Sequence, residues 1–124
     1  MRVALAILFF LMTMAPQSPD VEAEKGWMND ATDLQEDIRE AMGKKDGAKI
    51  AEAALKIDAL MEKTEGFWAA KKAADVVTLA QTARAHAKDV AAQARAGKIE
   101  QANDAFAKLN TTCNTCHDLH PEKR

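Results

Sequence analysis

The stretch at residues 99–117, IEQANDAFAKLNTTCNTCH, determines the fold expected for this chain of 124 residues. Its apolar positions recur at steps of three and four, the period of one helix face; they are Ile99, Ala102, Phe106, Leu109, Cys113 and Cys116. This apolar stripe runs directly into Cys113-Asn114-Thr115-Cys116-His117. We therefore expect both the fold and the chemistry to depend on the end of this helix.

Three more segments with the same period precede it, and the chain between them is rich in alanine, which favours helix. The first is expected at about 24–42, and the second from an N-cap at Asp46 to about Thr64. Gly66-Phe67-Trp68 interrupts the pattern, and a third helix then runs on to a stop at Gly97. Short connections make consecutive helices antiparallel neighbours. The sequence therefore predicts an all-α, up-down-up-down four-helix bundle.

Residues 1–23 have the order of a secretory signal peptide. Arg2 is followed by an apolar run of about a dozen residues, which is short of the ~20 that cross a bilayer. We expect cleavage after Ala23, which leaves 24–124 as the bundle domain with no membrane span. Cleavage removes one basic and two acidic residues from the 17 and 19 of the whole chain. The nearly neutral remainder argues against nucleic acid as a partner.

The C-x-x-C-H motif is the attachment sequence for c-type haem. Two thiols can add to haem vinyl groups, while the neighbouring imidazole of His117 reaches the iron. A thioredoxin-like pair is less suitable, because its thiolate is stabilised at a helix N-terminus, whereas Cys113 lies near the C-terminal end of its predicted helix. A zinc site would have to use Cys113, Cys116, His117 and His120, all within eight residues of one helix. We therefore predict one covalent haem c, at the C-terminal end of the fourth helix, and an exported protein.

The second axial ligand of the iron comes from a short set of candidates: Met28, Met42, Met61, His86 and His120. In the predicted topology the haem lies near the start of the first helix. Met42 is about 21 Å along that helix from Met28, and His86 is similarly remote. His120 shares a helix with His117 and cannot readily reach the opposite haem face. Met28 and Met61 remain as candidates for the ligand, and the aromatic residues expected to shield the haem beside them are Trp27, Phe67 and Trp68.

With these motifs the chain resembles the class II c-type cytochromes, which include cytochrome c prime and its low-spin relatives. The likeness covers the mature chain and includes Asp118 after the motif, the pair Phe67-Trp68, and Asp75-Val76. It implies that Met28 is the distal ligand and that Met61 packs against the ring. Many members carry an Arg after the haem His, where this chain has His120-Pro121. The contact with a haem propionate would then fall to another cation: Lys71, Lys72, Lys123 or Arg124.

A haem with two protein ligands mainly transfers electrons, and one with a single ligand binds small gases. We therefore expect a one-electron carrier of the bacterial periplasm, with low-spin haem on His117 and Met28. The alternative is a five-coordinate, cytochrome c prime-like protein that binds NO or CO. We expect no enzyme, since the chain contains no hydrolase, zincin or phosphate-loop motif. Redox proteins of unknown identity are the expected partners, and a homodimer through the first two helices stays open. A basic rim for docking would comprise Lys25, Lys63, Lys71, Lys72, Lys123 and Arg124.

Overall fold

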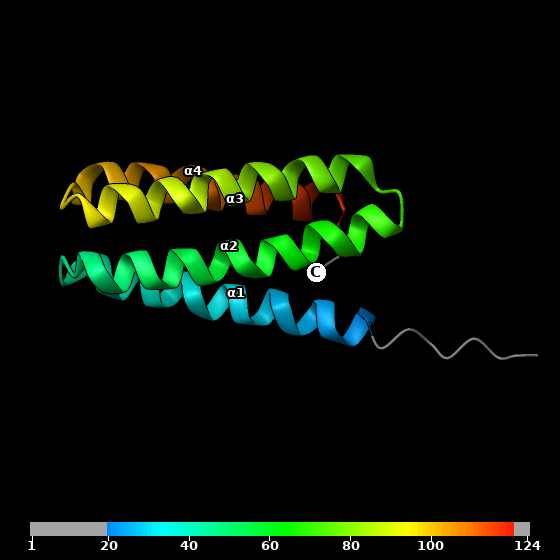
Figure 1. The fold of residues 1–124 in the computed structure, drawn as a ribbon, viewed down its shortest axis with the longest axis horizontal. Helices are drawn as coiled ribbons and strands as arrows, with labels where there is room; N and C mark the ends of the chain where they lie inside the picture. Colours follow the sequence, from blue (N-terminus) through cyan, green and yellow to red (C-terminus); the bar gives the residue numbers. More distant parts are fainter. Residues whose placement is uncertain (1–19, 121–124) are drawn as a thin grey trace, which may run out of the picture.

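The computed structural model describes residues 20–120, which form four helices (Figure 1). They are α1 (Asp20–Gly43), α2 (Gly47–Ala70), α3 (Ala74–Arg95) and α4 (Ile99–Leu119). Most of the expected signal peptide, together with Lys123 and Arg124 of the expected rim, lies outside the described residues. Among residues 20–120, no helix is long and apolar enough to cross a membrane.

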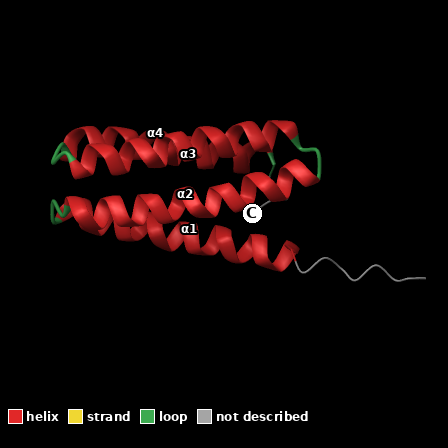
Figure 2. Cartoon of the chain, in the orientation of Figure 1, coloured by secondary structure: helices red, strands yellow, loops and turns green. Residues whose placement is uncertain are grey.

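The helices pack as antiparallel neighbours, with α2 against both α1 and α3, and α3 against α4 (Figures 1 and 2). The predicted all-α four-helix bundle is confirmed. The connections 44–46 and 96–98 lie together at the left of Figure 1, and we call this the two-loop end. The start of α1, the connection 71–73 and the end of α4 lie at the right. We call this the pocket end.

Local signals explain where most helices stop and start. The Asp46 carboxylate accepts a hydrogen bond from the Lys49 N–H at 3.2 Å, which confirms Asp46 as the N-cap of α2. Gly97 follows α3 with φ at +73°, the left-handed conformation that glycine adopts without strain. The predicted end of the second helix near Thr64 is wrong, because α2 continues to Ala70. Helix formation is maintained through Phe67 and Trp68, whose rings pack against each other.

The continuous hydrophobic core begins at the two-loop end. Ile38, Ile50 and Leu109 are fully buried there or towards the middle of the bundle, among many buried alanines. Gly47 lies so close to α3 that a Cβ on it would meet the Ala94 carbonyl oxygen at 2.5 Å. Met61 and Cys113 are only partly buried and lie against the margin of this core. The continuous buried core therefore ends before the pocket end, where Met61 and Cys113 are only partly buried.

Candidate cofactor pocket

A pocket opens among all four helices towards the pocket end of the bundle. The space between its walls measures about 640 Å³, and part of it is open to solvent. Most of the lining is apolar: Ala31, Ile57, Val76, Leu79, Ala80 and Ala83 contribute to it together with the residues described below. The pocket is thus a largely apolar space.

The α4 wall of the pocket carries Cys113, Cys116 and His117. Spacings of three and four bring these side chains to one side of the helix. Burial, and secondarily the neighbouring Cys116, raises the pKa of the Cys113 thiol to about 11. Cys113 is therefore a neutral thiol at neutral pH, unlike the thiolate of a thioredoxin-type pair.

The structure also separates the five candidates for a second iron ligand. Met28 on α1 and Met61 on α2 both line the pocket and are both half-buried. Met42 and His86 are not among the lining residues. His120 follows α4 and pairs through Nε2 with the Asp75 carboxylate at the start of α3. The two methionines that the sequence left open are thus the ones that share the pocket with His117.

The three aromatic residues expected beside the cofactor divide into two groups. Trp68 lines the pocket, whereas Trp27 and Phe67 line a separate hollow between α1 and α2. Phe67 joins the two groups, since its ring lies edge-on to Trp68 at 4.9 Å between centroids and to Trp27 at 6.4 Å. A continuous row of aromatic rings therefore connects the pocket wall with the outer face of the α1–α2 pair.

Five polar residues of the pocket were missed by the sequence analysis: Glu24, Thr32, Gln35, Thr64 and Thr112. The Gln35 amide donates to the Cys113 sulfur at 3.8 Å and so links α1 to α4. Thr64 and Thr112 donate to carbonyl oxygens one turn back in their own helices. Glu24 and Gln35 stand four before and seven after Met28, positions that share its helix face. The spacing of Glu24 and Gln35 from Met28 in the sequence could therefore have predicted these two as pocket residues.

The pairing of His120 with Asp75 joins the end of α4 to the start of α3 beside the pocket. The hydrogen bond from His120 is the main cause that lowers the pKa of the Asp75 carboxyl. Elsewhere in residues 20–120, no three His, Cys, Asp or Glu side chains are grouped to hold a metal ion by themselves. Within the described chain, the polar groups around the motif thus form no assembled zinc site.

Comparison with known proteins adds no identification, since no protein-family model, curated protein or solved structure matches this chain.

Proposed function

We propose that this protein is a monohaem c-type cytochrome of the bacterial periplasm that carries single electrons between redox proteins. The observation behind this proposal is the position of the C-x-x-C-H motif. Its two thiols and its imidazole all line one apolar pocket that is enclosed by four helices. A covalent cofactor attached there would complete the core at the end where the protein side chains leave space.

The residues present are compatible with a haem. A large apolar ring is stabilised by apolar walls, and the pocket supplies them from every helix. Cys113 and Cys116 are half-buried and are not joined in a disulfide. His117 follows directly, and a neutral imidazole nitrogen is an established iron ligand. The donor set is thus that of a covalently held haem.

Cys113 and Cys116 would each add across one vinyl double bond of the haem. Sulfur forms a bond to one vinyl carbon while the thiol hydrogen goes to the other, so the step needs no oxidant. Gln35, which donates to the Cys113 sulfur, holds this side chain towards α1.

His117 from α4 and Met28 from α1 are the proposed axial ligands. When bound, such a haem supplies an iron that changes reversibly between the ferrous and ferric states by one electron. A thioether ligand favours the reduced state and raises the reduction potential. With His117 and Met28 both holding the iron, no position on it would be left for a substrate, and the proposed role is therefore a carrier rather than an enzyme. The same two ligands also argue against the gas-binding alternative.

Visible absorption of the purified protein tests the proposal. We expect a c-type spectrum that stays with the denatured chain, low-spin bands in both oxidation states, and a Met-to-iron charge-transfer band in the oxidised state. Met28→Ala should abolish that band and open the iron to carbon monoxide. Met61→Ala, the matched control in the same pocket, should keep it. A Met28→Ala variant that stays low-spin refutes the ligand assignment, and a wild-type protein without haem refutes the function.

A further inference from the structure

We propose that Trp27, Lys63, Phe67 and Lys71 form a docking surface for the acidic face of a redox partner protein. We call these four residues the Trp27 surface. The inference rests on the proposed electron transfer and adds the place and the chemistry of the contact. It concerns the outer face of the α1–α2 pair at the pocket end, next to the pocket itself.

The Trp27 surface is a shallow hollow with an aromatic floor. Trp27 of α1 and Phe67 of α2 are half-buried, and Gly66 and Ala70 complete the lining without bulky side chains. Partly exposed aromatic rings in such a hollow are the residue type that is enriched at the centre of protein interfaces. The hollow therefore offers a partner an apolar anchor point.

Two lysines give this hollow its charge. The Lys63 ammonium lies 6.0 Å from the centroid of the Trp27 ring, and the Lys71 ammonium lies 4.9 Å from that of Phe67. Within residues 20–120 neither of them forms an ion pair with a carboxylate, whereas Lys25 of the expected rim pairs with Glu22. Both ammonium groups are thus available to carboxylates of another protein.

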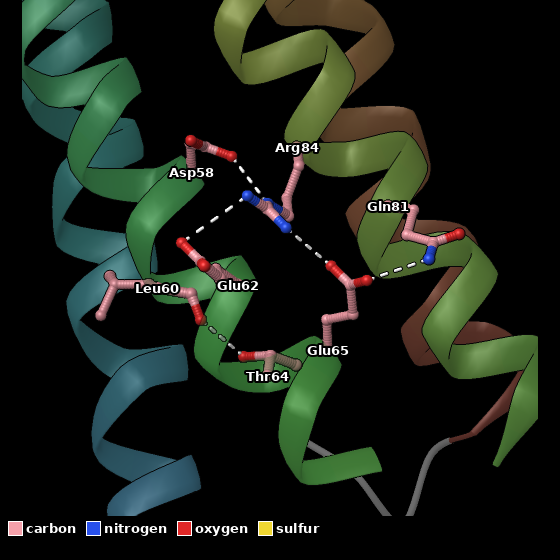
Figure 3. A network of polar contacts seen from close by, with 7 residues as sticks. All are labelled: Asp58, Leu60, Glu62, Thr64, Glu65, Gln81 and Arg84. Atoms are coloured by element: carbon pink, nitrogen blue, oxygen red, sulfur yellow. Dashed lines mark hydrogen bonds and ion pairs between the residues drawn. The ribbon is translucent and has the colours of Figure 1, made fainter. Parts of the chain in front are cut away.

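The carboxylates on the same stretch of α2 are held on its other side. Glu65 and Glu62 bind the Arg84 guanidinium of α3 at 2.8 and 3.6 Å, and Asp58 binds it at 2.9 Å (Figure 3). This part of α2 therefore presents bound carboxylates towards α3, while Lys63 lies over Trp27 of α1 and Lys71, directly after α2, lies over Phe67. Because the charges are separated in this way, the Trp27 surface is locally basic although the whole chain carries a net charge of −2.

The position of the Trp27 surface suits electron transfer. Trp68 lines the cofactor pocket, and Phe67 packs edge-on against it on the outer side. A partner that covers Trp27 and Phe67 would therefore be connected to the pocket wall through the rings of Phe67 and Trp68. Charge complementarity selects an acidic partner, and such attraction acts mainly on the rate of association.

Binding of an acidic peptide to the haem-loaded protein tests this proposal. The probe is hexaglutamate, and the readout is the indole N–H signal of each of the two tryptophans in ¹⁵N-labelled protein, assigned with Trp27→Phe and Trp68→Phe. We expect the Trp27 signal to move upon titration and the shift to disappear with added salt. Lys63→Glu/Lys71→Glu should weaken the binding at least tenfold, and should slow the oxidation of the reduced protein by ferricyanide by a similar factor.

Lys49→Glu/Lys98→Glu is the matched control, since it makes the same charge change at the two-loop end. It should leave both the shift and the oxidation rate within twofold of wild type. Equal effects of the two double variants, or a peptide that moves other signals but not that of Trp27, would overturn the Trp27 surface. The absorption spectrum of the same samples keeps this outcome separate from the proposed function. A normal haem spectrum without localised binding overturns only the docking surface.

Discussion

The two ends of this bundle are built in different ways. At the two-loop end, α2 and α3 approach so closely that Gly47 has no room for a Cβ, and Ile50 is fully buried. At the pocket end, the four helices surround a pocket, and its lining combines buried apolar residues such as Ile57 with the half-buried Met28 and His117. One end is stabilised by close side-chain packing within the chain, and the other holds the pocket in which the proposed haem would lie.

The two-loop end would therefore contribute mainly to stability, and the pocket end would carry the proposed function. The two-loop end can form a core from the chain alone, so it supports the helices whether or not a cofactor is attached. At the pocket end, Met28, Met61 and Trp68 stay half-buried, and a further apolar group would cover them. We expect the two ends to respond differently to the loss of haem, to core substitutions and to changes at glycine.

Loss of covalent attachment should have the largest effect. In Cys113→Ala/Cys116→Ala the pocket walls would lose the ring proposed to cover them, and each Å² of apolar surface left exposed costs about 25 cal/mol of stability. Hydrogen exchange should rise sharply in the first turns of α1 and the last turns of α4, and much less at the two-loop end. Asn114→Ala/Thr115→Ala, which changes the two exposed residues between the cysteines, should retain haem and normal exchange. A uniform rise along all four helices would contradict the division into two ends.

Core substitutions should have the next largest effect. Ile50→Ala leaves a cavity in the packed end and should lower the free energy of unfolding by roughly 2–5 kcal/mol. The loss should be the same with and without attached haem, because Ile50 lies away from the pocket. Met61→Ala should cost less than Ile50→Ala in haem-free protein and more with haem attached than without it. Urea unfolding of each of the two variants with and without haem measures these differences. The comparison requires that the free energy of unfolding falls with urea concentration at the same slope in all four samples. A haem-dependent cost at Ile50 would show that the ends are coupled.

The sequence predicted the parts of this structure that depend on local chemistry. The four apolar periods, the Asp46 cap and the stop at Gly97 are all confirmed. The short connections also predicted which helix ends would meet, and the place of the motif on α4 predicted which of the two bundle ends would carry the site.

The parts that sequence could not predict depend on contacts between helices. α2 continues past Gly66, and the ring of Phe67 packs there against Trp27 and Trp68. The contact with Trp27 comes from another helix, so the helix propensities of the residues in α2 could not predict it. The contact of Gln35 with Cys113 joins residues 78 positions apart. The cationic network of Arg84 likewise joins two helices. Each of these features follows from the mutual placement of helices and not from the periodicity of one segment.

The two glycines of α2 should give effects of opposite sign. Gly47→Ala forces the added Cβ against the Ala94 carbonyl, so α2 and α3 must move apart at a cost of about 1–2 kcal/mol. Gly66→Ala meets no atom within 4 Å and should stabilise the protein by about 0.5–1 kcal/mol, because alanine favours helix. Thermal unfolding of the two variants beside wild type measures both changes. If Gly47→Ala were also stabilising, the close packing assigned to the two-loop end would be wrong.

The Arg84 network lies between the two ends, and its contribution should depend on pH. Hydrogen bonds from Gln81 and then Arg84 lower the pKa of the Glu65 carboxyl below its ordinary value of 4.5. A carboxyl with a lowered pKa in the folded state stabilises the protein fully above the ordinary value, and loses that contribution as the pH falls through the lower one. Arg84→Met should therefore cost about 1 kcal/mol at pH 7 and progressively less as the pH falls below 4.5.

Arg95→Met is the control for that experiment, since Arg95 ends α3 at the two-loop end and forms no ion pair within the part of the chain that the structure describes. It should leave the pH dependence of unfolding unchanged. If Arg84→Met had the same cost at pH 3 as at pH 7, the side chain would act by packing α2 against α3 rather than by charge. The middle of the bundle would then resemble the two-loop end. If the cost of Arg84→Met disappears in acid, the middle of the bundle is instead stabilised by ion pairs between α2 and α3.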